Sequence, residues 1–238
     1  MLTRLPPTLV VLAALALAPA TALAGSRHGA APRRDAPNSL ATRAYIKADY
    51  ALVSIARANL PAAKAAITSL GTTVSGECPL VAADAPQNHD AEQLSNEVVG
   101  ALEVAAYQPD KEAMLAFAHT IRPLRWSNRK LTRAVDAYAT KLEGFPTLAP
   151  PNICADVTAW AASGYTTLPA SAVSFDKSFY TFDIEAEEVP LRLLRPYESA
   201  TAASLLHRTQ RLEEPLAEFE AEAVSDYSEI LDSLKLPQ

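Results

Sequence analysis

The sequence predicts an all-α fold, an irregular up-and-down helical bundle of long helices kinked at prolines. Apolar residues recur three or four positions apart along nearly the whole chain after residue 38, the spacing that places them on one face of a helix. No segment shows the alternation of apolar and polar residues that is typical of a half-buried strand. The chain also has only 7 glycines, which disfavours a β protein rich in tight turns.

Residues 1–24 are expected to be a secretory signal peptide. Arg4 supplies a positive charge, and the apolar run 9–18 is too short to cross a bilayer. Residues 22–24 (Ala-Leu-Ala) have the small-x-small pattern that signal peptidase cleaves. We therefore expect a secreted, extracytoplasmic protein, with an uncleaved membrane anchor as the alternative. No later apolar stretch is long enough for a transmembrane helix, and the excess of arginine over lysine is typical of a GC-rich bacterial genome.

After the leader, the sequence predicts a flexible tail followed by one domain. Residues 25–38 are small, polar and proline-rich, which is typical of a flexible basic tail. Residues 39–238 are expected to form a single helical-bundle domain, because their number suits one hydrophobic core. The first helix of that domain starts near Ser39 and keeps its apolar phase across Pro61, which predicts a kink. Gly71 is expected to end it.

The other helices are delimited by proline, glycine and N-cap residues. Proline cannot continue a helix without losing a backbone hydrogen bond, and glycine is favoured just past a helix end. Ser127 is expected to cap the helix that Gly144 closes, and Pro215 to kink the last helix. These residues predict helices at about 90–107, 109–122, 127–143, 151–163, 169–189 and 197–235.

The two cysteines, Cys78 and Cys154, are expected to form one disulfide. Both lie in the exported part of the chain, and an oxidising compartment allows them to pair. Two free thiols or an intermolecular bridge are the alternatives. Closing this loop would stabilise the fold by about 4–5 kcal/mol on chain-entropy theory. The bridge would tie the loop after the first helix to the short helix that contains Trp160.

No motif for catalysis, cofactor binding or metal binding is recognisable. The glycines are scattered, so no phosphate-cradling loop is present, and the sequence lacks the HExxH, GxSxG and EF-hand patterns. The four histidines share no i, i+3 or i+4 spacing, and no Glu-x-x-His pair of a di-iron bundle occurs. We therefore expect no catalytic residues, no metal site and no cofactor, and we favour a non-catalytic protein over an enzyme.

A basic segment is the one feature that departs from local helix rules. Its cations include two in the first turn of a helix, where the helix dipole disfavours positive charge. Backbone N–H groups, the dipole and guanidinium groups at one place form an anion-binding arrangement, and a tryptophan there can stack on a ligand. The predicted anion-binding residues are Arg122, Arg125, Trp126, Arg129, Lys130 and Arg133.

The function expected from these observations is an exported, non-catalytic binding or interaction module of the bacterial cell envelope. Its partner would be an anionic envelope component carrying phosphate or carboxylate groups. Nucleic acid is disfavoured, because the patch is small and the chain has a net charge of −6. The competing interpretation is that Glu103, Glu112 or the acidic last helix neutralises the patch internally.

Two further alternatives stay open at this point. Helices splayed at Pro61, Pro109 and Pro215 could enclose a small apolar ligand or haem in a cavity lined by aromatic residues. The chain could also be a hydrolase with an unfamiliar site, although no nucleophile, base and orienting group can be paired from the sequence. The aromatic residues expected to line such a cavity are Trp160, Phe175 and Phe179.

Overall fold

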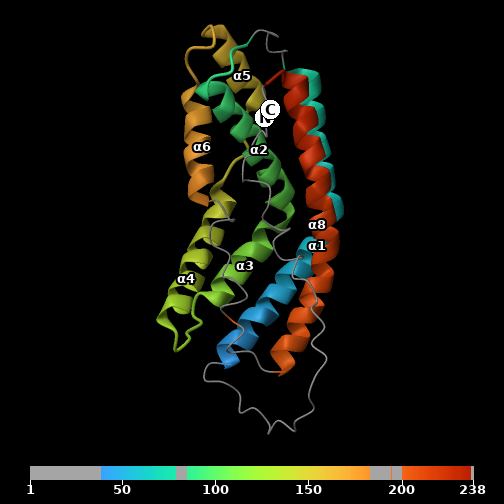
Figure 1. Ribbon diagram of the computed structural model, residues 1–238, viewed down its shortest axis with the longest axis vertical. Coiled ribbons are helices and arrows are strands. Elements are labelled where there is room, and N and C mark those ends of the chain that lie inside the picture. Colours follow the sequence, from blue (N-terminus) through green and yellow to red (C-terminus); the bar gives the residue numbers. More distant parts are fainter. Residues whose placement is uncertain (1–38, 79–84, 183–193, 195–199, 237–238) are drawn as a thin grey trace, which may run out of the picture.

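The structure is all-α, as the sequence predicts. The computed structural model describes residues 39–78, 85–182, 194 and 200–236, and within these ranges it contains helices and turns and no strand (Figure 1). The expected signal peptide, residues 1–24, and the expected tail, residues 25–38, lie outside the described residues. None of the described helices is long and apolar enough to cross a membrane.

Two long helices, α1 (Ser39–Glu77) and α8 (Ala200–Leu234), form one side of the molecule (Figure 1). They run parallel, since pairs of contacting side chains advance together along both helices. The Arg208 guanidinium lies over the Tyr50 ring, and the Lys64 ammonium lies beside Glu222 further along. These two helices are far apart in sequence, so their pairing is purely tertiary.

Pro61 and Pro215 lie inside continuous helices, as their uninterrupted apolar phase predicts. Figure 1 shows that the lower parts of both α1 and α8 are inclined to their upper parts, which is the expected effect of a proline within a helix. The expected end of the first helix at Gly71 is wrong. Helix α1 continues to Glu77, because Val74 in this last stretch is buried and its packing stabilises the additional turns.

The remaining helices run up and down beside this pair (Figure 1). The chain descends through α2 and α3, returns through α4, crosses the top in α5 and descends again in α6. The expected helix 169–189 is present as α6, and its last part falls outside the described residues. The bounds are α2 His89–Tyr107, η3 Gln108–Asp110, α3 Lys111–Ile121, α4 Arg129–Gly144, η4 Phe145–Thr147, α5 Ile153–Ala162 and α6 Ala170–Phe182.

The core of the bundle consists of two main hydrophobic clusters stacked along its length. The upper cluster joins α1, α2, α5, α6 and α8, and contains Leu94, Trp160 and Leu231. The lower cluster joins α1, α3, α4 and α8, and contains Ile46, Phe117 and Leu131. Burial of such side chains, worth about 25 cal/mol per Å² of apolar surface, is what holds amphipathic helices together.

A disulfide joins Cys78, directly after α1, to Cys154 in the first turn of α5, with the two Cα atoms 4.6 Å apart. The expected pairing is therefore confirmed. It fastens α5 to the upper end of α1, next to the upper hydrophobic cluster, which Cys78 also contacts. The start of α5 is in addition capped by the Asn152 side chain, which accepts a hydrogen bond from the Ala155 amide.

Candidate functional site

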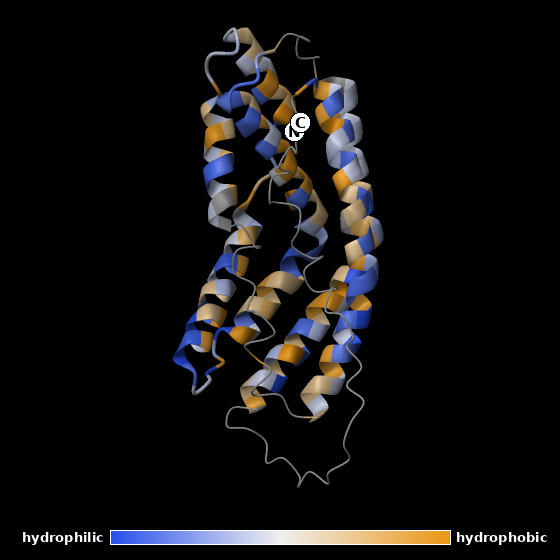
Figure 2. Ribbon diagram, in the orientation of Figure 1, coloured by the Kyte–Doolittle hydropathy of each residue, from blue (hydrophilic) through white to orange (hydrophobic). Residues whose placement is uncertain are grey.

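The predicted basic segment lies at the turn between α3 and α4, at the lower end of the bundle. Figure 2 shows this turn and the first turn of α4 as a strongly hydrophilic region of the ribbon. Asn128, and not Ser127 as expected, caps α4. Its side-chain oxygen accepts hydrogen bonds from the amides of Lys130 and Leu131. These two amides are therefore already satisfied, and they are not the outward-pointing donors that the sequence predicts.

Trp126 belongs to the core. Its side chain is only 5% exposed, and its Nε1–H donates to Thr42 Oγ1 in α1 at 3.0 Å. Its ring also packs edge-on against Tyr45. The Trp126 amide donates to the Thr132 hydroxyl, which anchors the turn to α4. Because of this burial, a ligand on the surface would not reach the indole face.

Arg122 is neutralised within the protein. Its Nη1 lies 2.8 Å from Glu143 Oε2, its Nε lies 3.9 Å from Asp136 Oδ1, and its Nη2 donates to the Thr140 hydroxyl. All three partners belong to α4. Internal neutralisation therefore occurs for this residue, but through α4 and not through the acidic last helix, Glu103 or Glu112.

The other four cations of the segment, Arg125, Arg129, Lys130 and Arg133, form what we call the basic corner. All four are exposed, and none has an ion pair with any residue that the structure describes. Arg125 donates to the carbonyl oxygens of Arg122 and Leu124, which satisfies acceptors at the end of α3. The corner is thus a surface of positive charge on a chain whose net charge is −6.

A second site, which the sequence analysis missed, is a pair of buried carboxyl groups between α2 and α5. Glu97 is 1% exposed and Asp156 is 4% exposed. With both groups ionised, neither Glu97 oxygen nor Asp156 Oδ2 has a hydrogen-bond donor. Asp156 Oδ1 accepts a hydrogen bond from the Ser171 hydroxyl of α6 at 2.5 Å. Buried carboxylates without donors are costly, so the pair must be protonated or must take a cation.

The protonation of Glu97 resolves this cost. Burial, the hydrogen bond to Asp156 and the charges of Asp156 and Asp176 together raise the pKa of Glu97 to about 9. Glu97 therefore holds a proton at neutral pH and forms a carboxyl–carboxylate hydrogen bond with Asp156. Burial also raises the pKa of the nearby Asp176, an effect that the charges of His89 and Lys177 oppose.

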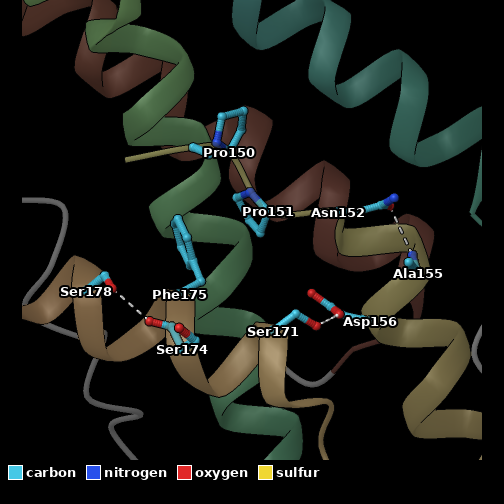
Figure 3. Close-up of a pocket in the computed structure, with 10 residues that line it drawn as sticks. Pro150, Pro151, Asn152, Ala155, Asp156, Ser171, Ser174, Phe175 and Ser178 are labelled. Atoms are coloured by element: carbon cyan, nitrogen blue, oxygen red, sulfur yellow. Dashed lines mark hydrogen bonds between the residues drawn. The ribbon is translucent and has the colours of Figure 1, made fainter. Parts of the chain in front are cut away.

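Asp156 also lines a pocket of about 430 Å³ at the surface between α5 and α6. Figure 3 shows its carboxyl group and the Ser171 hydroxyl facing each other beneath the Phe175 ring and Pro151. Ser174 and Ser178 continue the row of hydroxyls along α6. The complete lining is Ala149, Pro150, Pro151, Asn152, Ala155, Asp156, Ser171, Ser174, Phe175 and Ser178.

The aromatic residues expected to line an apolar cavity have different places. Trp160 is fully buried in the upper cluster, edge-on to Tyr165. Phe179 is buried and stacks on Phe175, and Phe175 alone of the three lines the pocket described above. In the described part of the chain, no group of three or more His, Cys, Asp or Glu side chains is arranged to hold a metal ion.

A pattern in the sequence does point to the acid pair. Glu97 stands three positions after Leu94 and four before Ala101, and Asp156 stands three after Ile153 and four before Trp160. Both carboxyl groups therefore occupy apolar faces, where an acidic residue needs a partner. The sequence does not show that the two faces meet.

No family model, curated protein or solved structure matches this chain. The geometry of its own residues is therefore the basis for a functional proposal.

Proposed function

We propose that this protein is exported and acts as a non-catalytic helical binding module, whose basic corner recognises a phosphate-bearing component of the bacterial cell envelope. The observation that carries the proposal is the exposure of Arg129, Lys130 and Arg133 without an acidic partner among the described residues. The two acidic residues of α4, Asp136 and Glu143, are already paired with Arg122.

The spacing of these cations favours a shared ligand. Arg129 and Arg133 are one helical turn apart, and Lys130 and Arg133 are three positions apart, so the three side chains are neighbours on α4. Like charges at this spacing cost about 0.2–0.5 kcal/mol per pair in a helix. A bound phosphate would remove that repulsion, and arginine offers it two parallel hydrogen bonds.

Because the whole chain is negatively charged, an anionic ligand is expected to bind at the basic corner and not nonspecifically over the surface. A net charge of −6 repels a polyanion from most of the surface. The basic corner is then the place where a phosphate group can approach, and the interaction is expected to weaken as salt screens it.

The test removes the three α4 cations together, by Arg129→Ala, Lys130→Ala and Arg133→Ala. Binding of the full chain is measured by isothermal titration calorimetry with soluble tripolyphosphate and with phosphatidylglycerol vesicles. Each cation near an anionic surface contributes about 1 kcal/mol, so the triple variant is expected to bind about 100-fold more weakly. Binding to the vesicles alone would identify a lipid surface, and binding to both probes a phosphate group from any source.

The matched control removes the same charge elsewhere, by Lys47→Ala, Arg57→Ala and Arg211→Ala, three exposed positions on α1 and α8. If the basic corner is the site, this control keeps its affinity within about threefold, because only screened long-range charge is lost. Equal weakening in both triple variants, or no binding of either probe by the unmodified protein, would overturn the proposal.

A further inference from the structure

The lower end of the bundle is built from three segments that are distant in sequence. The start of α1, the turn between α3 and α4, and the start of α8 lie there together (Figure 1). The Trp126 indole N–H donates to Thr42 Oγ1 at 3.0 Å, which joins the turn to α1. The Arg208 guanidinium lies over the Tyr50 ring, which joins α8 to α1. The basic corner therefore shares this end of the molecule with the first turns of α1 and α8.

Leu40, in the first turn of α1, is an apolar side chain that belongs to neither of the two main hydrophobic clusters. It is 74% exposed, compared with 44% for Ile55 and 37% for Val224, the other exposed large apolar side chains among the described residues. Figure 2 shows the hydrophobic start of α1 and the hydrophilic turn between α3 and α4 at the same end of the molecule. Cations beside an apolar side chain are the combination that suits the boundary between water and lipid.

Acidic residues are absent from this end in the described part of the chain. No Asp or Glu occurs in residues 39–48, 122–135 or 200–212, although the whole chain has a net charge of −6. On α8 the first acidic residue is Glu213, which lies about 20 Å from the helix start at 1.5 Å per residue. The electrostatic field of the molecule therefore turns its lower end toward an anionic surface and repels that surface from the remainder.

We propose that the partner of the basic corner is the surface of an anionic lipid bilayer, on which the bundle stands by its lower end. The cations of the corner then lie at the level of the lipid phosphates, and Leu40 inserts between the headgroups. This proposal rests on the proposed function and names the source of the phosphate.

Leu40 favours a bilayer over a soluble polyanion. A soluble polyanion would leave this side chain in water, whereas a bilayer removes it from water, which is favourable for an apolar group. An end-on contact is also limited in height. Lys47 is about 10 Å further up α1 than Leu40, and charges are screened beyond a Debye length of about 8 Å at physiological salt.

The first test places a fluorescent probe at the proposed contact, by Leu40→Trp. The native tryptophans, Trp126 and Trp160, are 5% and 0% exposed, so a change in emission on vesicle addition reports on the introduced indole. With phosphatidylglycerol vesicles, this emission is expected to move to shorter wavelength and to be quenched by lipids brominated on their acyl chains, because indole favours the membrane interface. Ile55→Trp is the matched control, about 22 Å further up α1, with unchanged emission expected.

The second test removes the apolar contact, by Leu40→Ser, and repeats the calorimetric titrations of the full chain with phosphatidylglycerol vesicles and with tripolyphosphate. Vesicle affinity is expected to fall at least about fivefold, since the burial of a leucine side chain is lost. Tripolyphosphate affinity is expected to stay unchanged, because all cations remain. Ile55→Ser, which removes an exposed apolar side chain from the middle of the same helix, should leave both affinities unchanged.

The two probes separate failure of this proposal from failure of the proposed function. Binding of tripolyphosphate without binding of vesicles would overturn the bilayer as the partner and leave phosphate recognition in place. Absence of binding to both probes would overturn both. Equal vesicle affinity for Leu40→Ser and the unmodified protein, or an unshifted emission of Leu40→Trp on bound vesicles, would also overturn the proposed contact.

Discussion

Glu97 shows how one buried side chain makes a helical bundle sensitive to pH. The unfolded chain releases this proton near the ordinary glutamate value of 4.5, whereas the folded protein keeps it until the pH approaches 9. The folded state thus binds more protons than the unfolded state between these values. The stability that Glu97 contributes is therefore fully present below the unfolded pKa and is lost as the pH rises toward the folded pKa.

The variant Glu97→Gln is expected to lose this pH dependence. A glutamine amide can donate to Asp156 as the protonated carboxyl does, but it cannot ionise. One group of this kind contributes a slope of at most about 1.4 kcal/mol per pH unit. Urea unfolding between about pH 5 and pH 8 should therefore show a smaller decline in the free energy of unfolding for the variant than for the unmodified protein.

The exposed Glu92 on the same helix provides the comparison for this measurement. Glu92→Gln is expected to change stability by no more than about 0.5 kcal/mol at any pH, as is usual for surface positions. Parallel pH profiles for Glu97→Gln and the unmodified protein would contradict the protonated state of Glu97.

At the scale of helices, α2 and α6 approach each other closely at Gly100. Gly100 is buried where α2 meets α6, and a Cβ atom there would lie 2.7 Å from Phe175 Cε1 and 3.2 Å from Phe179 Cγ. Two stacked aromatic rings therefore occupy the space that a side chain would need. The glycine sets the distance between the helices, and with it the position of the Phe175 ring in the pocket.

Gly100→Ala is expected to destabilise the protein by up to about 2 kcal/mol. Alanine improves helix propensity by about 1 kcal/mol, but forcing the rings apart in a packed core costs about 1–3 kcal/mol. Gly71→Ala is the matched control, because a Cβ atom there meets Ile230 at an ordinary 3.7 Å. It should stabilise α1 by about 0.5–1 kcal/mol. Thermal unfolding measures both, and a stabilised Gly100→Ala would contradict the close packing of α2 against α6.

The molecule as a whole is held by two stacked cores and one covalent link. The parallel pair of α1 and α8 contributes to both hydrophobic clusters, and the clustered residues of α2, α3, α4 and α5 belong mostly to one of them. The disulfide closes a loop between residues 76 positions apart and fastens α5 at the upper end. The bridge restricts the conformations of the unfolded chain. In the folded protein it also fixes the position of α5, whose residues line the pocket.

Reduction of the disulfide is expected to lower the free energy of unfolding by about 2–5 kcal/mol. Urea unfolding followed by far-ultraviolet circular dichroism, with and without a phosphine reductant, measures the effect. The double variant Cys78→Ser, Cys154→Ser should match the reduced protein and show no response to the reductant. Equal unfolding midpoints for the oxidised and reduced protein would mean that the bridge does not contribute to stability.

The sequence was sufficient for most features that depend on near neighbours along the chain, although it misplaced the end of α1 and the N-cap of α4. Helix type follows from a period of three to four residues, and most helix ends follow from proline, glycine and capping side chains. With two cysteines there is a single intramolecular pairing to predict. These features need no knowledge of which helices meet, and they are confirmed in the described residues.

Tertiary contacts decided the rest, since burial and pairing join residues that are distant in the chain. Helix α1 continues beyond Gly71 because its side chains remain packed against the bundle there, and the low helix propensity of one glycine is too small an effect to end the helix. Trp126 is buried because its indole N–H meets Thr42, 84 positions away. Glu97 keeps its proton because the apolar faces of α2 and α5 meet and exclude water from two carboxyl groups at once.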